Sequence, residues 1–202
     1  MPIDVTDVRS SQKEKLERFP TKISPKIERI SVPIFLPKKA VSVKQLTVDN
    51  IDSFAKVRDL RHLEYQNIPI EEFKFKQGLQ KILGEQGTFQ DWGGESDDLF
   101  STRLVIKGER KNATFGLKGR GTKGILTPKK MGKRGDQIQR LFRAPADVFL
   151  IQYWGQIDES IIEQMKQFAI AKSALENRII YFGVIDDQDT LRILIAYNDC
   201  FS

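Results

Sequence analysis

Residues 146–154 read ADVFLIQYW, in which apolar side chains follow one another almost without interruption. A strand with one solvated face alternates apolar and polar residues, whereas a strand covered on both faces does not. The stretch therefore predicts a central strand that is buried on both sides. Helical patterns in the flanking sequence supply crossover connections, so we expect parallel pairing around this strand.

Downstream of this strand, Asp158 can cap a helix that begins in IDESIIEQMKQF. Apolar residues recur there at the three- and four-residue spacing of a core-facing helix stripe. The members of this stripe are Ile161, Ile162, Met165, Phe168, Ala169 and Leu175. The segments RIIYFGVID and LRILIAY then predict two terminal strands.

Upstream, a basic, glycine-rich loop separates the central strand from a hairpin and two helices. Asp49 or Asn50 can begin a first helix, in which Ile51, Phe54, Val57, Leu60 and Leu63 repeat at helical spacing. A second helix follows Pro69 and ends near Gly84 or Gly87. Strands over 99–107 and 113–119 surround GERKN, which we interpret as a hairpin loop. Asp136 can cap a short helix through QIQRLF.

The first 48 residues differ from the rest because prolines recur at positions 20, 25, 33 and 37. SVPIFLP and AVSVKQLTV could form short edge strands, but the prolines argue against a central one. The sequence thus predicts an extended N-terminal arm over 1–48 and one α/β domain over 49–202. In that domain we expect a mixed central sheet flanked by helices.

Positive charge is concentrated between Arg103 and Arg143, where thirteen lysines and arginines face only two acidic residues. This segment carries a net charge of +11, whereas the whole chain carries +6. Such a concentration favours a polyanionic partner, because each cation that neutralises a phosphate releases condensed counterions. We expect nucleic-acid contacts from the cations of the loop, which are Arg120, Lys123, Lys129, Lys130, Lys133 and Arg134.

Several classes of function are excluded by composition. Cys200 is the only cysteine and His62 the only histidine, so disulfide scaffolds, zinc clusters and Ser-His-Asp triads are ruled out. No apolar run approaches the ~18 residues that a transmembrane helix needs, and the N-terminus does not read as a secretion signal. We therefore expect a cytoplasmic protein without a membrane anchor.

The predicted hairpin would bring two side chains of opposite charge close together. Alternate residues of a strand share a face, so Gly116 and Lys118 lie on the face opposite to Phe115 and Leu117. Asp98 stands at the entrance of the preceding strand, and the hairpin would bring that region near Lys118.

This arrangement resembles the PD-(D/E)XK restriction-like nuclease superfamily. Its members have a helix before a β hairpin, an acid at the start of the second core strand, an acid-x-Lys triplet on the next strand, and then a helix and a further strand. The resemblance spans roughly 85–154 and implies a restriction-endonuclease-like core. By position it implies that Asp98 binds a metal, that Lys118 orients or deprotonates the attacking water, and that Glu85 is the acid of the leading helix. Gln152 lies where some members carry a supporting polar residue.

One position departs from the pattern, because the triplet reads Gly-Leu-Lys with Gly116 in place of its acid. Either another acid occupies the space, with Glu95, Asp97 and Glu85 as candidates, or the site is inactive. Each residue also has a purely structural interpretation: Asp98 could cap a turn, Lys118 could belong only to the basic face, Glu85 could be a solvated helix end, and Gln152 could join a core network.

The resemblance implies a metal-dependent DNA endonuclease that uses Mg²⁺ or Mn²⁺ held by Asp98, Glu85 and Glu95, with Lys118 and Gln152 completing the catalytic set. It favours DNA over RNA as the partner, and it implies a homodimer. Two alternatives stay open. One is an inactive nucleic-acid-binding module on the same scaffold, and the other is an interaction domain whose basic loop binds an acidic protein.

Overall fold

The computed structural model describes residues 41–60, 68–85 and 99–202. Contacts within the chain divide it into two units, Met1–Pro37 and Lys38–Ser202. All of the described residues belong to the second unit. No helix in these described ranges is long and apolar enough to cross a bilayer.

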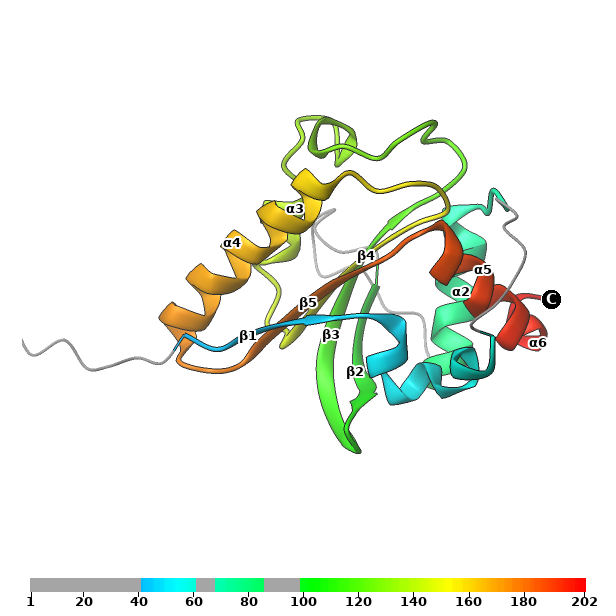
Figure 1. Ribbon diagram of the computed structural model, residues 1–202, viewed down its shortest axis with the longest axis horizontal. Coiled ribbons are helices and arrows are strands. Elements are labelled where there is room, and N and C mark those ends of the chain that lie inside the picture. The colour runs from blue at the N-terminus through cyan, green and yellow to red at the C-terminus, as the bar shows by residue number, and fades with distance from the viewer. Residues whose placement is uncertain (1–40, 61–67, 86–98) are drawn as a thin grey trace, which may run out of the picture. The chain divides into compact units, whose positions relative to one another are not determined.

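A five-stranded mixed sheet with the order β1-β5-β4-β3-β2 forms the middle of this unit (Figure 1). β1, β5, β4 and β3 run parallel to one another, and β2 pairs antiparallel with β3. The strands are β1 (Val43–Leu46), β2 (Leu99–Ile106), β3 (Glu109–Lys118), β4 (Val148–Tyr153) and β5 (Ile180–Ile185). The predicted α/β class with a mixed sheet and flanking helices is confirmed.

Helices cover both faces of the sheet (Figure 1). α3 (Gln137–Leu141) and α4 (Glu159–Glu176) pack on one face, here called the α4 face. α2 (Glu72–Leu83), α5 (Asp187–Ala196) and two 3₁₀ helices (Val48–Asn50 and Asp52–Asp59) pack on the other, here called the α5 face. A short helix, α6 (Asn198–Phe201), packs against α2.

All six residues of β4 are buried, as the run of apolar side chains predicts. Phe149, Ile151 and Tyr153 lie in the apolar core of the α4 face, whereas Val148 and Leu150 lie in that of the α5 face. β4 also has a strand on each side, so its backbone groups are paired in both directions. Its position confirms the prediction of a central parallel strand.

The C-terminal segment LRILIAY was predicted as a strand, and that prediction is wrong, because the segment lies in α5. Asp186 begins this helix by accepting a hydrogen bond from the backbone N–H of Asp189 at 2.9 Å. Asp187 and Asp189 lie in the first turn, where negative charge is favoured by the helix dipole. The acidic residues before the apolar run were therefore the signal for a helix.

The β2–β3 hairpin is tighter than predicted. Ile106 pairs with Glu109, so the turn consists of Lys107 and Gly108 alone. Both residues have positive φ, 53° and 77°, as a two-residue turn that matches the strand twist requires. Residues of the predicted GERKN loop thus extend β3 instead.

The predicted first helix forms as 3₁₀ helix with a kink at Phe54. Ile51, Phe54 and Val57 are fully buried, so the apolar pattern was interpreted correctly as a buried face. Their three-residue spacing fits the three residues per turn of a 3₁₀ helix better than the 3.6 of an α-helix. Leu63 lies outside the described residues.

Two further predictions concern single elements. α4 follows the predicted stripe and its Asp158 cap, except that Leu175 is 79% exposed and takes no part in the core. β1 forms from the AVSVKQLTV segment as the edge strand that the sequence allowed, although those residues were assigned to the arm. A side chain at Gly183 of β5 would collide with the carbonyl oxygen of Leu46, so glycine permits this pairing. SVPIFLP lies outside the described residues.

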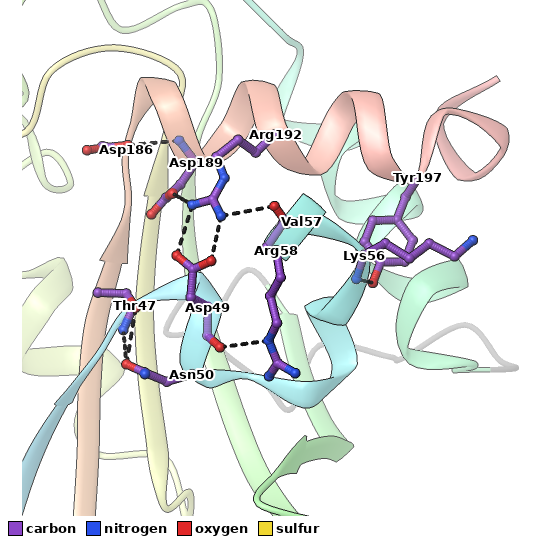
Figure 2. Close-up of polar contacts among 10 residues, drawn as sticks. All are labelled: Thr47, Asp49, Asn50, Lys56, Val57, Arg58, Asp186, Asp189, Arg192 and Tyr197. Atoms are coloured by element: carbon purple, nitrogen blue, oxygen red, sulfur yellow. Dashed lines mark hydrogen bonds and ion pairs between the residues drawn. The ribbon is translucent and has the colours of Figure 1, made fainter. Parts of the chain in front are cut away.

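Arg192 of α5 connects the segment after β1 to the rest of the α5 face (Figure 2). Its guanidinium contacts both carboxylate oxygens of Asp49, at 2.5 and 3.0 Å. It also donates to Asp189 at 2.9 Å and to the carbonyl oxygen of Val57 at 3.0 Å. Because the Arg192 side chain is only 13% exposed, these contacts are shielded from solvent and fix the 3₁₀ segment against α5.

Burial, followed by the neighbouring charge of Asp186, raises the pKa of Asp189 to about 6 despite its contact with Arg192. The folded state therefore binds this proton more tightly than the unfolded state, whose aspartate pKa is about 3.9. The contribution of Asp189 to stability then falls as the pH rises from about 4 through about 6.

We expect Asp189→Asn, whose amide oxygen can still accept from Arg192, to remove this loss. As the pH rises from 4 to 7, the free energy of unfolding of the variant, measured relative to that of the wild type, should increase by roughly 2–3 kcal/mol. Urea denaturation of both proteins at a series of pH values measures this difference. Parallel stability curves for the two proteins would show that Asp189 titrates normally in the folded state.

Candidate nucleic-acid interface

The basic loop, residues 119–136, connects β3 to α3 and packs onto the α4 face. Leu126 and Met131 are fully buried in the core of that face. Leu126 also pairs in a short parallel bridge with Ile157, where its N–H donates to the Gln156 carbonyl at 2.8 Å and its carbonyl accepts from the Asp158 N–H at 2.9 Å. The sequence predicted a basic, glycine-rich loop at this position. It is irregular, but these contacts hold it in place.

Two side chains hold the carbonyl groups of the loop. The Tyr153 hydroxyl, at the end of β4, donates to the carbonyl oxygens of Gly124 at 2.6 Å and Thr122 at 3.2 Å. Burial raises the pKa of this phenol. The Lys130 ammonium donates to the carbonyl oxygens of Lys123 at 2.7 Å and Ile125 at 2.8 Å. Four consecutive carbonyls are thus hydrogen-bonded, two of them to β4 and two to a lysine of the loop itself.

The six predicted nucleic-acid-binding cations fall into two groups. Lys130 is occupied with the carbonyls of the loop, and Arg120 forms an ion pair with Glu71, just before α2. The remaining four are exposed and have no ion-pair partner among the residues that the structure describes. They are Lys123, Lys129, Lys133 and Arg134. The loop therefore presents four unneutralised positive charges on a fixed backbone.

Lys118 is the last residue of β3 and is half-buried beside Tyr153 of β4. Strand alternation places it on the α4 face together with Gly116. A Cβ at Gly116 would lie 3.7 Å from side-chain atoms of Ile151 and Leu141. A Cβ would fit there in ordinary van der Waals contact, but the carboxylate of an acid at position 116 would begin against apolar side chains.

Glu85 does not meet Lys118. Its carboxylate accepts from the Ser101 hydroxyl at 2.6 Å and the Thr102 N–H at 3.3 Å, and it lies 3.8 Å from Arg103. Ser101 pairs with Ala113, five residues before Lys118, which corresponds to about 16 Å along the strand. Glu85 also lies on the α5 face, so it joins the end of α2 to β2 rather than contributing to a site at Lys118.

Gln152 is fully buried but likewise faces away from Lys118. It pairs with Leu117 in the β3–β4 register, and both side chains lie on the α5 face. Its amide nitrogen donates to the Thr190 hydroxyl of α5 at 3.1 Å. The structural interpretation of Gln152 as part of a core network therefore fits its position.

The other predicted metal ligands, Asp98 and Glu95, lie outside the described residues, as does Asp97. Within residues 41–60, 68–85 and 99–202, no group of three or more acidic, histidine or cysteine side chains comes together to hold a metal ion. Two carboxylates that do share a partner, Asp49 and Asp189, both contact Arg192. The described residues thus do not provide a donor set for Mg²⁺ or Mn²⁺.

Neither a protein-family profile, nor a curated protein, nor a solved structure is similar enough to this chain to be matched with it. The features of the molecule that bear on function are therefore the geometry of the basic loop and of the sheet edge from which it departs.

Sequence reasoning found the exposed cations but missed the residues that position them. The signal was present, since ILTP and Met131 place apolar side chains inside an otherwise polar stretch. Tyr153 carried no comparable signal, because nothing in ADVFLIQYW shows which loop carbonyls its hydroxyl reaches.

We expect Tyr153→Phe to loosen the basic loop, because the carbonyls of Thr122 and Gly124 lose their shared donor. The free energy of unfolding should fall by about 1–3 kcal/mol, and the N–H groups of residues 122–130 should exchange faster with solvent. Hydrogen–deuterium exchange by mass spectrometry measures the second effect directly. Tyr181→Phe is the matched control and should leave the loop unchanged; equal exchange in the wild type and Tyr153→Phe would contradict the anchoring role.

Proposed function

We propose that this chain is a nucleic-acid-binding module that holds the phosphate backbone with its basic loop. The observation that carries this proposal is the set of four exposed cations, Lys123, Lys129, Lys133 and Arg134. They lie on a loop whose backbone is bonded to the end of β4 and to residues 156–158. Between positions 119 and 135 the loop contains no acidic residue. An anion approaching it meets positive charge without a competing carboxylate from the loop itself.

A fixed loop suits a phosphate backbone for two reasons. Contacts with phosphate release counterions, which is the main source of affinity for nucleic acid. A loop that is already ordered does not lose backbone entropy on binding, so more of that affinity is retained. The alternative, an acidic protein partner, would be attracted by the same positive charges.

The scaffold of this module is proposed to be restriction-like. What supports this is the element order, since α2, the β2–β3 hairpin, α3 and β4 follow one another as the resemblance implies, with β3 and β4 parallel. Lys118 lies at the end of β3, where the lysine of the acid-x-Lys triplet is expected.

Binding is favoured over cleavage by the positions of the remaining candidates. Gly116 faces apolar side chains, and Glu85 and Gln152 lie on the opposite face from Lys118. The DNA endonuclease is the second candidate, which the position of Lys118 favours. It would need Asp98 together with another acid to complete a metal site.

Binding to labelled duplex DNA, measured by fluorescence anisotropy over a series of salt concentrations, tests the proposal. We expect Lys133→Gln/Arg134→Gln to weaken binding at least tenfold and to lower the dependence of log K on log salt by about 1.8, since each phosphate contact contributes about 0.9.

The control variant is Arg110→Gln/Lys166→Gln, which removes the same charge from exposed positions on β3 and α4. Its binding should stay within about threefold of wild type at equal salt. Equal losses in the two double variants would mean that only net charge matters and that the loop is not the interface.

Incubation with supercoiled plasmid, in Mg²⁺, Mn²⁺ or EDTA, separates the two candidate functions. We expect salt-sensitive binding in all three conditions and no metal-dependent nicking, because the acid of the triplet is absent at Gly116. Nicking that requires the metal and is lost in both Asp98→Asn and Lys118→Ala would overturn this expectation and establish the endonuclease.

A further inference from the structure

The basic loop contains three large apolar side chains besides its proline, and these side chains differ in burial. Leu126 and Met131 are fully buried, whereas Ile125 is 49% exposed. One exposed apolar side chain is ordinary on a protein surface. What distinguishes Ile125 is the combination of its fixed backbone and its charged surroundings.

Hydrogen bonds on both sides of Ile125 fix its backbone, so the side chain stays on the surface. Its carbonyl accepts from Lys130 at 2.8 Å, and the preceding carbonyl of Gly124 accepts from Tyr153 at 2.6 Å. The next residue, Leu126, is buried and is bonded through both its N–H and its carbonyl. Ile125 is therefore presented to solvent from a position fixed on both sides.

Positive charges on the same loop restrict what can cover this side chain. An apolar protein surface that packed on Ile125 would also approach the Lys130 ammonium, which bonds the Ile125 carbonyl at 2.8 Å, and desolvating a cation costs free energy. A nucleic acid satisfies both demands, because its phosphates pair with the cations while its sugars and bases offer apolar surface.

The chemistry of the side chain also selects the form of nucleic acid. Single-stranded bases are held mainly by stacking on aromatic rings. Aliphatic side chains, by contrast, act on duplexes, where they enter the minor groove and partly unstack a base step. A fixed isoleucine among lysines fits the second mode.

We propose that Ile125 is an apolar wedge that enters the minor groove of duplex DNA and bends it, while the surrounding cations hold the phosphates. This inference rests on the proposed nucleic-acid-binding function and specifies its substrate as duplex DNA. It predicts a division of roles: the cations determine the salt dependence of binding, and Ile125 adds affinity that salt does not affect.

Two measurements test this division with Ile125→Ala, Ile125→Leu and the matched control Ile195→Ala, which changes an isoleucine of α5 that is 45% exposed. The first is the affinity for a duplex of about 25 base pairs as a function of salt, and the second is its bending, measured by energy transfer between dyes at its two ends. Ile125→Ala should bind about tenfold more weakly with an unchanged salt slope, and it should bend the duplex less. Ile125→Leu and Ile195→Ala should behave as wild type.

The outcomes separate the inference from the function on which it rests. Wild type that binds duplex without bending it, or Ile125→Ala that binds and bends like wild type, overturns the wedge and leaves the binding module intact. A change of salt slope in Ile125→Ala also overturns it, because the substitution would then act through the cations. Equal losses in Ile195→Ala would show that the effect is not local to the loop.

Tighter binding to single-stranded DNA of equal length, with the same dependence on Ile125, would overturn the duplex assignment. Absence of salt-sensitive binding in wild type would instead remove the proposed function itself.

Discussion

The complete burial of β4 determines where the other strands and helices of this unit can lie. A strand whose six residues are all buried needs apolar cover on both faces and a paired strand on each side. α4 and α3 provide one cover, α5 and the 3₁₀ segment provide the other, and β3 and β5 pair with its edges. The remaining connections have to pass around this core, which brings the carboxyl ends of four parallel strands to one edge of the sheet.

The basic loop is linked to this core at the strand end. Tyr153 is the last residue of β4, so the hydroxyl that bonds the loop carbonyls is held by the most deeply buried element of the sheet. Leu126 and Met131 add apolar anchors from the loop into the same core. A stretch rich in glycine and lysine thus takes a defined path, although its own residues have no preference for regular structure.

Periodicity and capping predicted the elements that local sequence determines. The β4 strand and the α4 helix with its Asp158 cap were both predicted correctly, because burial pattern and cap lie within a few residues of each other. The strand prediction for LRILIAY was wrong because a short apolar run fits either a strand or a helix, and only the preceding acidic turn distinguishes them.

The candidate site, by contrast, depends on how residues that are distant in the sequence pack together. The face on which Gln152 lies relative to Lys118 is set by strand register, and register between β3 and β4 is decided by packing rather than by either segment alone.

The two roles of lysine in the loop affect how any mutational scan of this region should be interpreted. Lys130 resembles its neighbours in sequence, yet its ammonium bridges two carbonyls of its own loop. Replacing it removes two hydrogen bonds within the loop as well as a charge, so a loss of function at this position could result from a changed loop conformation instead of a lost contact with the partner. Substitution of the exposed lysines, by contrast, tests their contacts with the partner. A count of basic residues therefore overstates the contact surface, and acetylation of Lys130 would act as a conformational lesion rather than as simple neutralisation.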